Sequence, residues 1–108
     1  MRQDPVLSML SLAQKAGAIA SGEYAAEQAI KRGKAYLLIL AEDASENTRR
    51  KFQNSASFYE IPVLMQSTKD VLGHMLGKGE RSVAAVLDPG FSDSILKKAN
   101  GKSEIDRR

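Results

Sequence analysis

The 108-residue chain contains no cysteine and a single histidine, His74. Without cysteine it can form no disulfide framework, no thiolate zinc site and no cysteine nucleophile. A lone helical histidine is usually a packing or surface residue, and it cannot form a histidine pair for a metal ion. We therefore expect neither a metal site nor a cofactor.

Long apolar runs are also missing. The longest lies around residues 35–41, far short of the roughly 20 residues that span a membrane. Polar side chains and Pro5 interrupt residues 1–20, so this segment holds no secretion-signal core. Together with the absence of cysteine, these features predict a cytoplasmic protein without a membrane segment.

Catalytic motifs are absent as well. The segment Gly73–Gly79 lacks the spacing of a phosphate loop, because only three residues separate its first two glycines. No serine lies in a G-x-S-x-G elbow. Glu42 and Asp43 are adjacent at a predicted strand end, but Asp43 is better interpreted as the cap of the next helix. We expect that the chain is not an enzyme.

The positive charge is concentrated at one end of the sequence. Residues 97–108 carry five basic and two acidic side chains and supply the whole net charge of +3. Residues 1–96 carry eleven of each sign, so an RNA site there would have to come from local clustering. We expect one domain over residues 1–100, followed by a charged, disordered tail at 101–108.

Helix and strand patterns alternate along the chain. Caps and apolar spacing predict helices at about residues 4–17, 21–33, 43–58, 68–76 and 88–100. Strands are predicted at residues 18–20, 36–41, 61–65 and 83–87. The continuous apolar run Tyr36–Ala41 is typical of a central strand covered on both faces. This order predicts an α/β fold, a three-layer α-β-α sandwich with a mixed sheet of about four strands.

Several helix starts carry capping signals. Asp4 precedes Pro5, a residue that suits the first helical position. Either Asp43 or Ser45 is predicted to cap the third helix, with Glu46 three residues after Asp43 to bond back. The segment 67–70 has the pattern of a capping box for the fourth helix.

The second helix presents one polar column. Its buried stripe is predicted to consist of Ala25, Ala26, Ala29 and Ile30. Tyr24, Gln28 and Arg32 then follow one another at four-residue spacing on the exposed side. An aromatic ring, an amide and a guanidinium are groups that stack on a base, read a base edge and hold a phosphate.

The ends of this helix extend the column. Lys31 and Lys34 add positive charge at its carboxyl end. The segment Ser21–Glu23 begins the helix with backbone N–H groups that favour an anion, although Glu23 would repel a phosphate close by. The alternative is that this polar face is simply solvated and its basic end complements the helix dipole.

Two further basic segments are less informative. Arg49, Arg50 and Lys51 spread over about 200° of a helix, so a solubilising surface is the favoured interpretation. The loop Lys78–Ser82 directly precedes a predicted strand, where it could contact an RNA backbone or simply turn.

Short motifs follow one another in a specific order over residues 6–97. They are Leu12–Gly17, Ser21–Glu23, Ala29–Ala35, Leu37–Ser45, Ile61–Val63, Leu72–Gly73 and Ser82–Val86. With these motifs the sequence resembles the ribosomal L-seven-Ae and L-thirty-e superfamily, and within it the small bacterial ribosome-associated members. The resemblance implies a three-layer α-β-α sandwich. It also implies binding of kink-turn or related bent RNA through the start of the second helix and loops at the same edge.

The start of the second helix departs from the usual motif of that superfamily. In its kink-turn binders this helix typically begins Gly-x-Asn-Glu-x-x-Lys. Aligned on Gly22, this sequence has Tyr24, Ala25 and Gln28 in place of Asn, Glu and Lys, while residues 31–33 match downstream. The hydrogen bonds with which Asn and Glu read sheared purine pairs are therefore missing.

The first hypothesis is a non-catalytic, ribosome-associated RNA-binding protein, expected to be a monomer, that recognises structured, kink-turn-like RNA. The candidate RNA-binding residues are Ser21, Gly22, Glu23, Tyr24, Gln28, Lys31, Arg32, Lys34, Glu42 and Arg81. The alternative is a protein-interaction adaptor on the ribosome or on an RNA-processing factor. A third hypothesis is an accessory module for an RNA-modifying enzyme.

Overall fold

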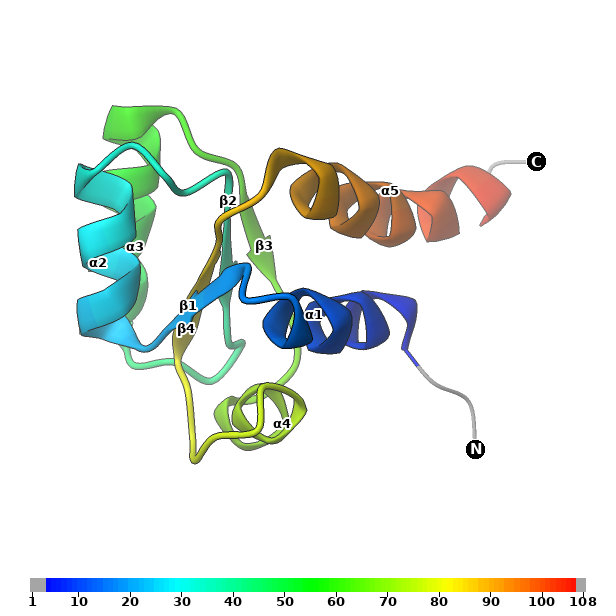
Figure 1. Ribbon diagram of the computed structural model, residues 1–108, viewed down its shortest axis with the longest axis horizontal. Helices are drawn as coiled ribbons and strands as arrows, with labels where there is room; N and C mark the ends of the chain where they lie inside the picture. Colours follow the sequence, from blue (N-terminus) through cyan, green and yellow to red (C-terminus); the bar gives the residue numbers. More distant parts are fainter. Residues whose placement is uncertain (1–3, 107–108) are drawn as a thin grey trace.

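A computed structural model describes the backbone of residues 4–106 and the side chains of residues 4–100. In chain order the elements are α1 (Pro5–Lys15), β1 (Ile19–Ser21), α2 (Glu23–Lys31), β2 (Leu37–Leu40), α3 (Glu46–Tyr59), β3 (Val63–Met65), α4 (Lys69–Met75), β4 (Val83–Val86) and α5 (Pro89–Asp106). Figure 1 shows α2 and α3 on one face of the sheet, and α1 and α5 on the other with α4 beside α1. The predicted three-layer sandwich is confirmed.

The four strands form a mixed sheet in the order β1-β4-β2-β3. β4 is antiparallel to both β1 and β2, whereas β2 and β3 are parallel. Because β1, β2 and β3 therefore run in the same direction, they all finish at the end of the sheet where β4 begins. We call this the loop end of the sheet. It gathers the segments that follow β1, β2 and β3 with the segment that precedes β4.

The two inner strands are buried along their whole length. All four residues of β2 and all four of β4 are buried. Leu37 and Ile39 pack against α1, α4 and α5, while Leu38 and Leu40 pack against α2 and α3. Burial of each such side chain stabilises the fold by roughly 1.5–3 kcal/mol. The predicted central strand covered on both faces is therefore confirmed over residues 37–40, whereas Tyr36 lies outside it and is exposed.

Side chains cap four of the helices, and in α5 the cap is Asp88, whose carboxylate accepts a hydrogen bond from the N–H of Phe91 at 2.9 Å. Asp4, Ser45 and Thr68 cap α1, α3 and α4 by accepting backbone N–H hydrogen bonds at 2.8, 3.1 and 3.2 Å. In α2 the N-cap position is occupied by Gly22, which offers no side-chain hydrogen bond. The N–H groups of the first turn of α2 thus have no side-chain acceptor at the cap.

Asp43 and Glu46 have other partners than those predicted. The Asp43 carboxylate accepts a hydrogen bond from the N–H of Lys69 at 2.8 Å, so Asp43 caps the start of α4 and not the next helix, α3. The Glu46 carboxylate pairs with Arg50 at 3.1 Å, one turn along α3, instead of bonding back. The reason is that Ser45 already occupies the N-cap of α3, which leaves Asp43 free to reach the neighbouring loop.

Helix α5 extends further than the sequence indicated. It continues through Asp106, into the segment 101–108 for which a disordered tail was expected. Gly101 lies inside the helix, where glycine costs only about 1 kcal/mol relative to alanine and does not force an end. Residues 107–108 lie outside the described residues, and the domain boundary at residue 100 stays a prediction.

Helix α4 fixes the loop that leads into β4. Gly73 is buried in α4, and a Cβ atom there would overlap the carbonyl oxygen of Gly79. The N–H of Arg81 donates to the carbonyl of Lys69 at 3.1 Å. Backbone contacts with α4 therefore hold the loop 77–82 and set the position of Arg81 at the loop end of the sheet.

Replacing Gly73 with alanine tests this contact. We expect Gly73→Ala to lower the free energy of unfolding by about 1–3 kcal/mol, because the loop backbone must move away from the new methyl group. Gly79→Ala is the matched control, since its Cβ would meet open space, and it should change stability by less than about 0.5 kcal/mol. Urea denaturation of both variants measures the difference, and equal stabilities would contradict the contact.

Candidate RNA-binding surface beside helix α2

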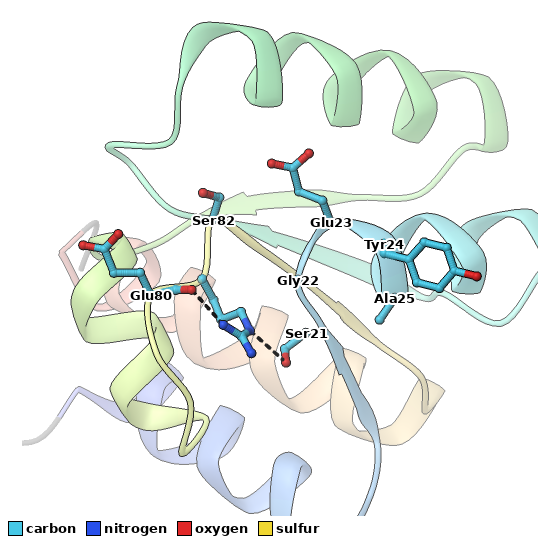
Figure 2. Close-up of a pocket in the computed structure, with 8 residues that line it drawn as sticks. Ser21, Gly22, Glu23, Tyr24, Ala25, Glu80 and Ser82 are labelled. Carbon is cyan, nitrogen blue, oxygen red and sulfur yellow. Dashed lines mark hydrogen bonds between the residues drawn. The ribbon is translucent and has the colours of Figure 1, made fainter.

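Two hollows flank the start of α2. The first, which we call the loop-end hollow, has a volume of about 480 Å³ and lies at the loop end of the sheet. Its lining residues are Ser21, Gly22, Glu23, Tyr24, Ala25, Glu80, Arg81 and Ser82. Figure 2 draws these eight residues, which come from the β1–α2 connection and from the loop before β4. Five of them were predicted as RNA-binding residues from the sequence.

Gly22 allows the chain to turn sharply from β1 into α2. Its φ of +95° lies in the region that favours glycine, so a side chain here would be strained. Its N–H donates to the carbonyl of Val83 at 2.8 Å, which extends the β1–β4 pairing by one hydrogen bond. An added Cβ would lie 3.7 Å from Nε of Arg81, so the glycine also keeps the floor of the hollow open.

Arg81 forms one wall of the loop-end hollow. Its Nε lies 3.4 Å from Oγ of Ser21, and one terminal nitrogen donates to the carbonyl of Glu80 at 2.9 Å. These contacts hold the guanidinium in place without neutralising it. Among the residues that the structure describes, Arg81 forms an ion pair with no carboxylate. The guanidinium therefore retains donors and a full charge for a ligand.

The Glu23 carboxylate is directed toward α3 and away from the centre of the hollow (Figure 2). Its Oε2 accepts a hydrogen bond from the hydroxyl of Thr48 at 3.0 Å, and that hydroxyl accepts one from Ser45 at 3.0 Å. This hydrogen bond holds the carboxylate of Glu23 toward α3 without neutralising its charge, so that a phosphate in the hollow would lie farther from it. Thr48 was not a candidate from the sequence, since nothing local shows that it lies opposite a residue 25 positions away.

The second hollow, which we call the α2 hollow, lies along the exposed side of α2 and has a volume of about 380 Å³. It is lined by Ala20, Tyr24, Ala25, Gln28, Ala29, Arg32, Lys34 and Leu87. The predicted column of Tyr24, Gln28 and Arg32 thus lines a single concave surface, together with Lys34. Ala25, which was predicted to be buried, is only half-buried and lines both hollows.

Tyr24 connects the two hollows because it lines both of them. Its side chain is 77% exposed, although it is one of only six aromatic residues in the chain. In Figure 2 its ring extends along α2, away from the loop that carries Glu80. An aromatic ring that the core does not use is available to stack on a ligand.

Lys31 and Glu42 line neither hollow. Lys31 pairs with Glu27 at 3.5 Å, and Lys51 of α3 pairs with the same carboxylate at 3.2 Å. The hydrogen bond from Lys51, with the charges of both lysines, lowers the pKa of Glu27. Glu42 is exposed at the loop end of the sheet, where its N–H donates to the carbonyl of Ser67 at 2.7 Å. Neither residue therefore belongs to the concave parts of the surface.

Among the described residues, His74, the acidic side chains and the helices add no further candidate site. His74 is exposed on α4, as expected for a lone histidine. In the part of the chain that the structure describes, no three acidic or histidine side chains gather in a group that could hold a metal ion. Over the same residues, no helix has the length and apolar character needed to cross a bilayer.

The fold is that of a small α-β-α sandwich protein, and its candidate binding surface lies along the second helix. Residues 4–96 match the Ribosomal protein L7Ae/L30e/S12e/Gadd45 family, and the chain belongs to that family. The resemblance read from the sequence motifs is therefore confirmed.

Several characterised proteins are similar over most of the chain. The RNA-binding protein YlxQ of Bacillus subtilis (strain 168) is 36% identical over 88 residues, which are 82% of this chain and 88% of that protein. The protein of the same name from Enterococcus faecium is 34% identical, over 80% of this chain and 82% of the relative. The large ribosomal subunit protein eL30 of Aeropyrum pernix is 33% identical, over 79% and 86% respectively.

Solved structures share the fold. A protein of unknown function from Bacillus halodurans C superimposes with a TM-score of 0.86 at 34% identity, covering 91% of this chain and 99% of that one. The Giardia lamblia 15.5kD RNA binding protein gives a TM-score of 0.77 at 22% identity, covering 94% of this chain and 86% of that protein. At that identity the second likeness shows the fold alone.

The link between Glu23 and Thr48 can be tested by a double-mutant cycle. Thr48→Val keeps the side-chain shape but removes the hydroxyl, and we expect a loss of about 1 kcal/mol in the free energy of unfolding. Combined with Glu23→Ala, the two losses should fall short of additivity by about 0.5–1 kcal/mol, because both remove the same hydrogen bond. Chemical denaturation of the four proteins measures the coupling, and strict additivity would show that the two side chains do not interact.

Proposed function

We propose that this chain is a non-catalytic RNA-binding protein of the cytoplasm that acts as a monomer on ribosomal or other structured, kink-turn-like RNA. The relatives in B. subtilis and E. faecium are named RNA-binding proteins, and the A. pernix relative is a ribosomal protein. All three are similar over most of this chain. Family membership alone leaves the ligand open, so the proposal depends on the surface beside α2.

The observation that carries the proposal is the uncapped start of α2 beside Arg81. Unlike α1, α3 and α4, α2 begins without a side-chain acceptor for its free N–H groups. Those groups lie at the loop-end hollow, whose wall carries a guanidinium free of any described carboxylate. Backbone donors, a helix dipole and a fixed arginine together suit a phosphate of an RNA backbone.

The α2 hollow adds further basic side chains along the helix, where they could contact more phosphates. Arg32 and Lys34 line it, and neither pairs with a carboxylate that the structure describes. By contrast, Arg50 and Lys51 of α3 are both engaged in ion pairs. Although residues 1–96 are neutral in total, unpaired positive charge is therefore gathered along the α2 hollow, whereas Arg81 shares the loop-end hollow with the carboxylates of Glu23 and Glu80.

Tyr24 and Gln28 supply the contacts to bases in this proposal. They stand where kink-turn binders of the family use Asn and Lys, and Ala25 stands in place of Glu. A tyrosine ring can stack on an exposed base, and a glutamine amide can hydrogen bond to a base edge. Recognition would then depend on the shape of a bent RNA and on stacking, with less hydrogen bonding to sheared purine pairs.

Titration with a consensus kink-turn RNA and a straight duplex of equal length, each at two salt concentrations, tests the proposal. We expect preferential binding of the kink-turn RNA. Equal and strongly salt-dependent binding would support an RNA-binding protein that grips phosphates without reading the bend. Binding of neither RNA, or of their ribosomal equivalents, would contradict the proposal and favour a protein-interaction adaptor.

Removal of the Arg81 charge provides a sharper test. Arg81→Gln should weaken binding of the preferred RNA roughly tenfold and reduce the slope of log K against log salt by about one unit, the value for one phosphate contact. Arg50→Gln is the matched control, because it removes the same charge from an exposed, ion-paired site outside both hollows. If the two variants behave alike, Arg81 makes no specific contact with the RNA.

A further inference from the structure

The α2 hollow differs in chemistry from the loop-end hollow. Its inner side is apolar, and it is formed by Ala20 of the edge strand β1, Ala29 of α2 and Leu87 directly after β4. These three side chains belong to, or pack against, the apolar core between the sheet and α2. An apolar floor offers nothing to a phosphate, whereas it can contact the face of a nucleobase.

Polar groups of three kinds surround that floor. Tyr24 lies at the end nearest the loop-end hollow, Gln28 lies in the middle, and Arg32 with Lys34 lies at the far end. At a rise of 1.5 Å per residue, Tyr24 and Arg32 are separated by about 12 Å along the helix axis. A stacked strand would place about three or four nucleotides over that length at roughly 3.4 Å each, and a strand whose bases turn their faces to the protein is more extended and places fewer.

We infer that the α2 hollow binds a short unpaired, single-stranded segment, of at most about three nucleotides, that adjoins the folded RNA element. This inference rests on the proposed function, because the segment continues from the RNA held in the loop-end hollow. A base stacks on Tyr24, the faces of the following bases lie against Ala20 and Leu87, and their phosphates meet Arg32 and Lys34. Gln28 hydrogen bonds to one base edge.

A base-paired duplex cannot make the contacts that this hollow offers. In a duplex the base faces are stacked and closed, so only an unpaired segment can present them to an aromatic ring and an apolar floor. The two hollows share Tyr24 and Ala25 as lining residues and so adjoin at the start of α2, which places the single strand directly beside the structured element. The two hollows together thus recognise the junction between a structured RNA element and the single strand that adjoins it.

The test measures the affinity of the full chain for three kinds of RNA. The first is a blunt-ended kink-turn RNA. The second carries five unpaired adenosines, placed at one end or the other in two separate molecules. The third carries the same five adenosines paired in a longer duplex. We expect one of the tailed RNAs to bind about five- to tenfold more tightly than both the blunt and the paired forms.

Two charge-matched double variants locate the effect. Arg32→Gln with Lys34→Gln should abolish the advantage of the tailed RNA, so that the tailed and blunt forms bind with equal affinity, whatever loss of affinity the two forms share. Arg50→Gln with Lys51→Gln removes two charges from α3 and should preserve the advantage. In parallel, NMR titration with pentaadenylate should shift the methyl signals of Ala20, Ala29 and Leu87.

The outcomes separate this inference from the proposed function. Equal affinities for tailed and blunt RNA would overturn the inference while the proposed function stands. So would a paired extension that binds as tightly as the unpaired tail, since the hollow would then respond only to added phosphates. If the chain binds none of these RNAs or their ribosomal equivalents, and pentaadenylate leaves the methyl signals unchanged, both the proposed function and the inference are wrong.

Discussion

The antiparallel pairing of β4 with β1 and β2 is the constraint on which the rest of this structure depends. Because β4 runs against its neighbours, the loop that precedes it lies beside the segments that follow β1 and β2. Arg81 is thereby brought to Ser21 and Gly22, about sixty positions earlier in the chain. The pairing is itself secured by burial of both inner strands on both faces, so the position of the surface beside α2 follows from the core.

The surface beside α2 has a fixed backbone, and its cationic side chains remain available to a ligand. Its helix, its strand ends and its loop are fixed by backbone contacts such as those of Gly22 with Val83 and of Gly73 with the loop before β4. Its cations have few internal partners, and its one acidic member at the helix start is held by Thr48 of α3. A preorganised backbone with unneutralised charge binds a polyanion at a low cost in conformational entropy. The arrangement therefore suits RNA better than it suits a small apolar ligand.

Much of the fold could be predicted because each part of the sandwich has a local signal. The apolar run of β2, the cap at Asp4 and the four-residue spacing in α2 all act over a few residues, and the structure agrees with them. Contacts between distant segments have no such signal. Asp43 capping α4, Thr48 holding Glu23 and Gly73 seating the loop at Gly79 depend on the tertiary arrangement. For the same reason the sequence could not separate the candidate residues into two hollows or show that Lys51 of α3 pairs with the carboxylate that Lys31 contacts.

The central claim is that RNA contacts the chain along α2 and at Arg81. Ultraviolet crosslinking of the protein to RNA in the cells that produce it, followed by identification of the crosslinked peptides, tests this claim whichever RNA is the target. Crosslinks are expected within residues 16–31, which include Tyr24, and within the loop that ends at Arg81. Crosslinks confined to the exposed face of α3, or a protein that captures no RNA, would contradict the account.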